Sequence, residues 1–274
     1  MELKRASQFT LAELTRFWNE GYTGYFTPVT LTEAMMENWL RCGDFDLAHS
    51  LVLMDGDGLA GFSLAGVRED RAWIGGFGVA PAARGKGVAY GLFADHMAVL
   101  RNELGLASVQ LEVLVENWAR KVYERAGMVV KRRLSILQGR LGAPGAGAAV
   151  SQGAPLDLLG HHARLHAGCP SVWQREPGWI TKSLPETAAG LYTGPAEAPT
   201  GFLLCAPAGE GLRVIDAAAD TAESAAALLA GLARLHPGKS LVAVNEPEGG
   251  PVHAALTAAG LAEVRAQYEL KWEA

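Results

Sequence analysis

Cysteine and long apolar runs are both scarce in this sequence. Its 274 residues include only three cysteines, Cys42, Cys169 and Cys205, without the Cys-x-x-Cys or Cys/His spacing of a zinc module. This excludes a disulfide framework and indicates a reducing compartment. No segment approaches the roughly 18 consecutive apolar residues of a membrane span, and the N-terminus lacks the apolar stretch of a signal peptide. We therefore expect a cytoplasmic protein with no membrane partner.

Positive charge is also in short supply. The 24 Lys and Arg residues are outnumbered by 29 Asp and Glu residues, which gives a formal net charge of −5. A general nucleic-acid binder depends on an excess of Lys and Arg, so we expect no nucleic-acid partner. Hydrophobic residues make up 49% of the chain, which is far too apolar for a disordered protein. At about 150 residues per domain, the length favours two globular domains.

An uncharged run of Gly, Ala, Pro and Ser at residues 142–155 divides the chain, and it has the composition of a linker. We expect one domain at residues 1–141 and a second at residues 156–274. Apolar periodicity and turn residues predict the order α, α, β, β, β, α, β, α, β for the first domain. Its expected helices are 7–20, 31–40, 87–104 and 118–125, and its expected strands are 50–54, 59–67, 71–80, 108–115 and 129–141.

The second half repeats this order in reduced form. Its expected helices are 156–167, 220–235 and 251–259, and its expected strands are 201–206, 212–216, 241–245 and 261–272. Near the ends of the two halves, Tyr123-Glu-Arg-Ala-Gly-Met128 parallels Leu256-Thr-Ala-Ala-Gly-Leu261, so we infer an internal duplication. The predicted fold class is α/β, of the α+β type, with two tandem domains. Each has a mixed, mostly antiparallel sheet flanked by helices.

A glycine-rich loop joins the expected strand 71–80 to the expected helix 87–104. Within it, Arg84-Gly-Lys-Gly87 combines two basic side chains with glycines that let the backbone curl. At a helix N-terminus, such a loop forms a cradle of N–H groups for an anion. Its spacing fits neither a phosphate-binding Walker A loop nor a dinucleotide-binding G-x-G-x-x-G turn.

This loop and a later block resemble the GCN5-related N-acetyltransferases, the GNAT superfamily. Arg84-x-x-Gly87-x-Ala89 is similar to the Q/R-x-x-G-x-G/A signature of that family. The later block, which is similar to the family's LEV…N…A…Y block, comprises Leu111-Glu-Val113, Asn117, Ala119 and Tyr123-Glu-Arg-Ala-Gly-Met128. The resemblance covers residues 3–141, and the whole chain resembles the tandem-GNAT proteins with a degenerate C-terminal copy.

The resemblance implies that acetyl-CoA is the co-substrate and that its pantetheine arm enters between strands 71–80 and 108–115. It implies that the Val79 N–H polarises the thioester carbonyl and that Tyr123 protonates the departing thiolate. The implied cofactor-binding residues are Val79, Ala80, Arg84, Gly85, Lys86, Gly87, Val88, Ala89 and Asn117. For Asn117 the alternative is to cap the following helix.

Glu112 is the candidate general base, directly or through water, because it alternates with the valines of its strand. A cross-strand pair is the structural alternative for Glu112, and a core position is the alternative for Tyr123. In the second half, Val214–Ser224 has no glycine, Lys or Arg where the loop belongs, and Leu256 replaces the tyrosine. We therefore expect the second domain to be non-catalytic.

The expected activity is that of an acyl-CoA-dependent N-acetyltransferase. In it, the primary amine of a small molecule or peptide attacks the thioester directly. The two domains would form a pseudo-dimer within one chain. A non-catalytic acyl-CoA sensor or scaffold, and a mycothiol-synthase-like enzyme, are the alternatives.

Three further features of the sequence are not assigned to acetyl transfer. No metal is expected, because His161, His162 and His166 are interpreted as a solvated helix face. Ser63 lies in a hairpin strand and is not expected to be a nucleophile. The aromatic segment Tyr22–Pro28 suits an acceptor pocket and a lid over the core equally well.

Overall fold

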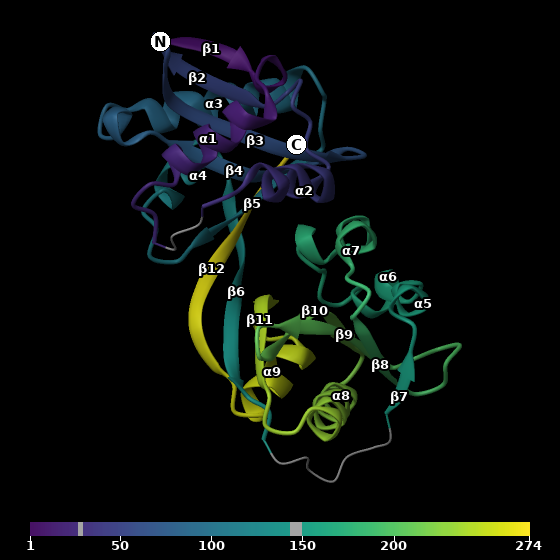
Figure 1. Cartoon of the computed structure of the whole chain (residues 1–274). Helices are drawn as coiled ribbons and strands as arrows, with labels where there is room; N and C mark the ends of the chain where they lie inside the picture. The colour runs from purple at the N-terminus through teal and green to yellow at the C-terminus, as the bar shows by residue number, and fades with distance from the viewer. Residues whose placement is uncertain (27–29, 143–149) are drawn as a thin grey trace. The chain divides into compact units, whose positions relative to one another are not determined.

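A computed structural model describes residues 1–26, 30–142 and 150–274. The chain forms two compact units (Figure 1). Unit 1 comprises Met1–Lys131 and Tyr268–Ala274, and unit 2 comprises Arg132–Gln267. Each unit places helices on a mixed β-sheet, which confirms the predicted α/β class with two tandem domains.

The division into units differs from the expected boundary at residues 142–155. Strand β6 (Val129–Arg140), which was expected to close the first domain, runs antiparallel to β11 (Ser240–Pro247) in unit 2. The final strand, β12 (Ala262–Glu273), ends in unit 1, where the Leu270 side chain is fully buried in the core. The two closing strands are therefore exchanged between the expected domains. Part of the expected linker, residues 143–149, lies outside the described residues.

Unit 1 has the strand order β1-β2-β3-β4-β5-β12. Neighbours from β1 to β4 are antiparallel, and β4 and β5 are parallel. The further strands are β1 (Glu2–Arg5), β2 (Leu51–Asp55), β3 (Gly58–Arg68), β4 (Arg71–Val79) and β5 (Ser108–Leu114). The helices are η1 (Ala6–Gln8), α1 (Leu11–Gly21), α2 (Glu33–Gly43), η2 (Pro81–Ala83), α3 (Val88–Asn102) and α4 (Arg120–Arg125).

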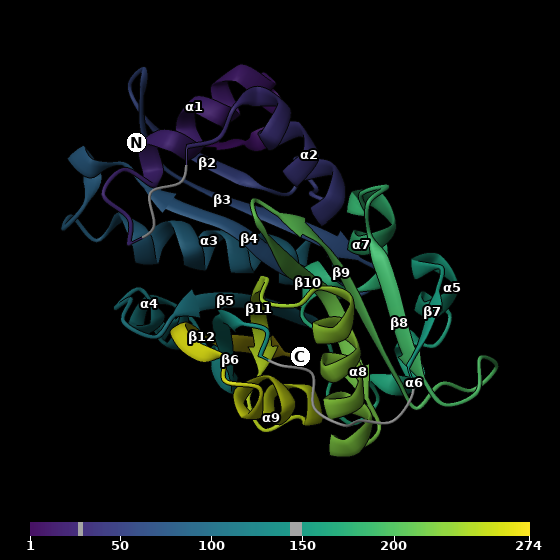
Figure 2. The ribbon, with the colours of Figure 1, turned by 60° about the horizontal axis from the view of Figure 1, so that its bottom comes forward.

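Helices cover both faces of the unit 1 sheet (Figure 2). Helix α1 begins at a capping box in which Thr10 accepts from the Glu13 N–H and Glu13 accepts from the Thr10 N–H. Its apolar side packs with α2 on one face, through residues such as Phe17 and Met36. Helix α3 packs on the other face through residues such as Phe93. The first helix starts later than expected because β1 and η1 occupy the N-terminal residues.

Unit 2 has the strand order β6-β11-β10-β9-β8-β7. Its further strands are β7 (Ser151–Gly153), β8 (Ala189–Thr193), β9 (Gly201–Ala208) and β10 (Gly211–Ala219). Its helices are α5 (Pro155–Leu159), α6 (His162–Leu165), η3 (Trp173–Arg175), α7 (Pro177–Ser183), α8 (Ala222–Leu235) and α9 (Pro251–Ala258). The single helix expected at 156–167 is two short helices, and β8 and α7 were not expected. In the described residues, no helix is long and apolar enough to cross a membrane.

Candidate functional site

Strands β4 and β5 separate partway along their length. They pair in parallel only from Arg71 with Ser108 to Trp73 with Gln110. Beyond this point the pairing of β4 with β3 shifts register, which leaves Gly75 as a bulge. A bulge bends its strand and ends regular pairing, so the edge of β4 after Trp73 is left without a strand partner on the β5 side.

The free edge of β4 presents backbone donors. The Ala80 N–H donates to the Ala60 carbonyl of β3 at 3.0 Å, whereas Val79 lies opposite Gly61 in the next position of the ladder. Because N–H groups alternate between the two sides of an antiparallel strand, the Val79 N–H points away from β3, toward the β5 side. The Phe77 N–H has the same orientation and donates to the Tyr22 hydroxyl at 3.4 Å. This edge suits an extended ligand backbone.

The glycine-rich loop leads directly into the N-terminus of α3. Gly85 and Gly87 have φ values of 76° and 79°, which non-glycine residues rarely adopt. A Cβ atom at either position would meet nothing within 4 Å, so the backbone conformation is what requires glycine. Gly87 is the N-cap of α3 and offers no side chain to the first amides of the helix. The first turn of α3 contains no acidic residue. An uncapped helix N-terminus with an exposed basic side chain, Lys86, beside it is an arrangement that suits an anion.

The Arg84 side chain binds protein carbonyls. Its Nε donates to the Val79 oxygen at 3.0 Å, and its Nη2 donates to the Gly21 oxygen at 3.1 Å and to the Thr23 oxygen at 2.7 Å. The guanidinium group therefore ties the segment after α1 to the end of β4. Its expected use beside a pyrophosphate stays a prediction.

Tyr123 lies on α4 and is 6% exposed. Its ring packs against Phe77 at 5.8 Å and Phe93 at 4.8 Å between centroids. Burial raises the pKa of Tyr123 far above its ordinary value, and the nearby Tyr22 and Tyr25 raise it further. Its hydroxyl is protonated at neutral pH, as in an ordinary tyrosine, and burial makes it a weaker acid. Sequence reasoning singled out the aromatic segment that contains Tyr22, but it gave Tyr22 no role.

Glu112 lies on β5 and is half-buried. It faces away from the α3 side of the sheet, where the core holds Leu111 and Val113, as the alternation predicted. Its Oε2 accepts a hydrogen bond of 2.7 Å from Nε1 of Trp73, which is 2% exposed. The indole fixes the position of the carboxylate. Sequence reasoning missed Trp73 because its partner is on a neighbouring strand.

The other expected binding residues contribute through the backbone. The Asn117 Oδ1 accepts from the Ala119 N–H at 2.9 Å in the turn that precedes α4, whose N-cap is Ala119. Ala80 is fully buried, and the Val88 side chain is buried beside Ala60. Of these, the Val88 and Ala89 amides lie in the first turn of α3, where an anion would bind.

Unit 2 contains a similar separation of strands with different chemistry. Strands β10 and β11 pair in parallel only at Leu212 with Leu241 and at Arg213 with Val242. Helix α8 follows, and the Thr221 side chain accepts from the Ser224 N–H at 3.2 Å, which caps the helix. Its first turn also contains an acidic residue, Glu223. The N-terminus of α8 is therefore satisfied by the protein itself.

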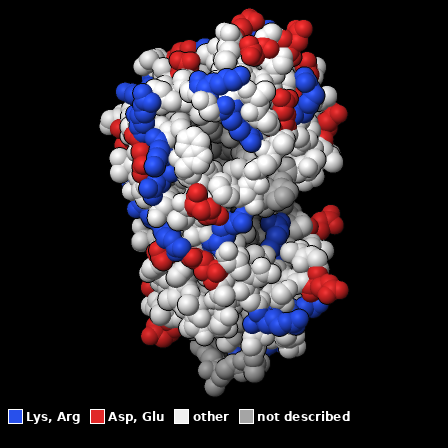
Figure 3. Space-filling view, turned by 90° about the vertical axis from the view of Figure 1, so that its left-hand side faces the viewer, with Lys and Arg blue, Asp and Glu red and all other residues white. Residues whose placement is uncertain are grey.

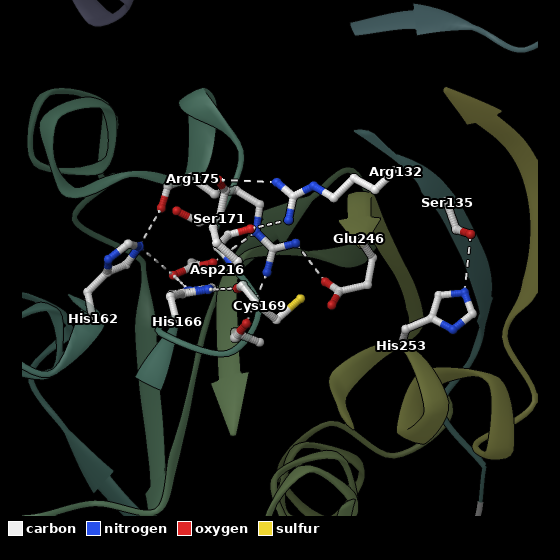
Figure 4. A network of polar contacts seen from close by, with 12 residues as sticks. Arg132, Ser135, His162, His166, Cys169, Ser171, Arg175, Asp216, Glu246 and His253 are labelled. Atoms are coloured by element: carbon white, nitrogen blue, oxygen red, sulfur yellow. Dashed lines mark hydrogen bonds and ion pairs between the residues drawn. The ribbon is translucent and has the colours of Figure 1, made fainter. Parts of the chain in front are cut away.

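A buried polar network holds the separated strands of unit 2 (Figure 4). Arg175 donates to Asp216 of β10 at 2.8 Å and to Glu246 of β11 at 2.6 Å. Although burial raises the pKa of Asp216, the charge of Arg175 and a hydrogen bond from His166 hold it below the ordinary value. His162 and His166 are 7% and 8% exposed, so their interpretation as a solvated helix face was wrong.

Surface charge is mixed on the face shown in Figure 3. Lys and Arg side chains adjoin one another along the upper left edge of this view, with Asp and Glu side chains beside them.

Residues 11–128 match the model of the acetyltransferase (GNAT) family. Three solved structures resemble the chain over nearly its whole length. A GCN5-related N-acetyltransferase from Sphaerobacter thermophilus has a TM-score of 0.69 and 13% identity, covering 99% of this chain and 95% of its own. A tandem GNAT protein from the clavulanic acid biosynthesis pathway has a TM-score of 0.66 and 13% identity, covering 99% of this chain and 98% of its own. A GCN5-related N-acetyltransferase from Anabaena variabilis has a TM-score of 0.69 and 14% identity, covering 98% and 72%.

No curated protein sequence is significantly similar to this one. Residues 11–128, which are less than half of the chain, are thus similar to the GNAT acetyltransferases. As a whole it has the tandem-GNAT fold. The family is one of acyl transfer, and the site described above lies within the matched residues.

Proposed function

We propose that unit 1 is an N-acetyltransferase that uses acetyl-CoA and acts on the primary amine of a small molecule or peptide. The observation that carries this proposal is the combination of an uncapped α3 N-terminus with an unpaired β4 edge directly before it. Both features are backbone binding sites, one for a diphosphate and one for an extended amide chain.

Binding follows from these two features. The amides of Val88 and Ala89, with the Lys86 ammonium, hold the pyrophosphate, and the conformations of Gly85 and Gly87 expose those amides. The pantetheine arm lies along β4 in place of a strand. The acetyl carbonyl then accepts a hydrogen bond from the Val79 N–H, which is typically worth about 10²- to 10³-fold in rate for such a donor.

The reaction requires one proton to leave the amine and one to reach sulfur. The amine nitrogen attacks the acetyl carbon, its proton passes to Glu112 or to a water held by it, and the new C–N bond replaces the C–S bond. The departing thiolate takes the hydroxyl proton of Tyr123, which burial keeps protonated. Solvent then restores the Tyr123 proton. A general acid of this kind contributes about 10²- to 10⁴-fold.

We further propose that unit 2 does not bind acyl-CoA. Thr221 satisfies the helix terminus that corresponds to the α3 terminus, and Arg175 joins Asp216 to Glu246 between the separated strands. Leu256, which replaces the tyrosine, is fully buried and has no proton to donate. Unit 2 thus keeps the architecture without the acid or the anion site.

The direct test is incubation of the full chain with acetyl-CoA and a broad panel of primary amines, while the release of free thiol is followed. We expect thiol release that depends on the amine and on Tyr123. A protein that binds acetyl-CoA with no amine-dependent release is a sensor or scaffold, and the proposal of catalysis then fails. A cysteinyl-sugar amine in the panel tests the mycothiol-synthase-like alternative.

A further inference from the structure

Unit 2 brings two histidines and a carboxylate together in its interior. His162 and His166 come from α6 and the residue that follows it, and Asp216 comes from β10. All three are buried, and one potential ligand atom from each lies within 4.8 Å of the others. Figure 4 shows the two histidines and Asp216 at the left of the network, beside Arg175.

The distances between the donor atoms match those of a tetrahedral metal site. His166 Nε2 lies 3.0 Å from Asp216 Oδ2, and His162 Nε2 lies 3.5 Å from the same oxygen. The Arg175 carbonyl oxygen lies 3.1 Å from His162 Nε2. Ligands bound to zinc at about 2.0–2.2 Å stand about 3.3–3.5 Å apart in a tetrahedron. The side chains therefore need only small shifts to surround one ion.

The surroundings orient His166 and Asp216 for a metal, whereas His162 Nε2 faces the Arg175 carbonyl and must give up the proton that it donates there before it can bind an ion. His166 Nδ1 lies 3.0 Å from the Cys169 carbonyl, which only accepts, so Nδ1 carries a proton and Nε2 is directed at the cluster. The other oxygen of Asp216 is held by Arg175 Nε at 2.8 Å, which leaves Oδ2 for the ion. Glu246 binds Arg175 at 2.6 Å and compensates its charge.

We infer that His162, His166 and Asp216 form a divalent transition-metal site, most suited to zinc, with the Arg175 carbonyl oxygen or a water as the fourth ligand. Two imidazoles and one carboxylate are a donor set that zinc prefers over magnesium or calcium. Because the ligands are buried, the ion is structural. It connects α6, and the segment that runs from α6 to η3, to strand β10. This inference does not depend on the proposed transferase activity of unit 1.

A network without metal is the competing explanation. If His166 carries protons on both nitrogens, its contacts with Asp216 and the Cys169 carbonyl are satisfied without an ion. The two explanations differ in metal uptake. Metal binding also displaces a proton from the cluster, whereas the ion-pair network takes up no metal.

The experiment uses the untagged full chain, stripped with a chelator and then exposed to zinc or cobalt(II). We expect about one zinc per chain by elemental analysis, and visible cobalt bands of tetrahedral intensity. We also expect the melting temperature of unit 2 to rise by about 5–10 °C at zinc about a hundredfold above its dissociation constant. Absence of uptake by both metals would overturn the inference.

Matched variants locate the site. His162→Gln and His166→Gln each remove one imidazole ligand and should abolish zinc uptake and the cobalt bands. His161→Gln changes the neighbouring histidine outside the cluster and should retain both. Uptake that persists in both ligand variants places the metal elsewhere and overturns the assignment. If the ligand variants fail to fold, the spectrum of cobalt bound to the wild-type chain is the test. A spectrum that shows no nitrogen ligands, or a geometry that is not tetrahedral, contradicts the inference.

Discussion

Substitution of Gly87 separates the role of the loop in binding from its role in folding. Gly87 has a φ of 79° and no atom within 4 Å of an added Cβ. An alanine there meets no clash, but the left-handed backbone costs it about 1–2 kcal/mol. We expect Gly87→Ala to lower the free energy of unfolding by that amount, and the melting temperature by about 2–4 °C for each kcal/mol.

The same methyl group affects acetyl-CoA more strongly. The methyl group would occupy open space at the N-cap of α3, beside the Val88 amide at which we propose that the pyrophosphate binds. We expect acetyl-CoA affinity to fall at least about tenfold, equivalent to about 1.4 kcal/mol. Isothermal titration calorimetry on the folded variant measures this, and denaturant unfolding measures the stability separately.

Gly105 provides the matched control. It has a φ of 62°, nothing within 4 Å of an added Cβ, and a place beyond the other end of α3. Helix α3 spans 15 residues, or about 22 Å, so Gly105 is remote from the loop. Gly105→Ala should cost similar stability and leave acetyl-CoA affinity unchanged. Equal affinity in both variants would refute the assignment of the loop to the pyrophosphate.

Three further predictions concern unit 1. Tyr123→Phe should lower kcat about 10²- to 10⁴-fold with little change in acetyl-CoA affinity, and steady-state kinetics that show unchanged turnover remove Tyr123 from the mechanism. Glu112→Gln should lower kcat over a similar range, whereas Trp73→Phe, which removes the 2.7 Å hydrogen bond that positions the carboxylate together with part of a buried ring, should lower it less; the reverse order contradicts the base assignment. Burial holds the pKa of His96 at about 3, against 6.5 for an ordinary histidine. Between these two pH values, His96 is protonated in the unfolded chain and neutral in the folded chain. The associated stability is present above pH 6.5 and is lost as the pH falls, by about 2 kcal/mol at pH 5. Urea unfolding above pH 6.5 and at pH 5 should show this loss of stability in the wild type and not in His96→Gln. An equal loss in the two proteins excludes His96 as its source.

Features that depend on local chemistry were predictable from the sequence. Gly85 and Gly87 are required by backbone angles within a single turn, so the loop and the start of α3 were placed to within a residue. The alternation of Glu112 with apolar residues gave its face of β5 correctly.

Features that depend on distant partners were not predictable. The strand after Gly127 and the final strand have similar amphipathic patterns, and nothing in either indicates which sheet edge it joins, so their exchange was missed. The two buried histidines of α6 looked solvated because their partner, Asp216, is 50 residues away from His166. Arg84 has the residue type of a phosphate ligand, and only the fold shows that three carbonyls engage its side chain.

The most direct test of the proposed active site is a crystal structure of the full chain with acetyl-CoA. The account predicts the pyrophosphate at the Val88 and Ala89 amides and the pantetheine arm along β4 beyond Trp73. It also predicts the acetyl group beside the Val79 N–H and the Tyr123 hydroxyl, with no ligand between β10 and β11. Acetyl-CoA bound at the Thr221 end of α8, or away from the α3 loop, would contradict it.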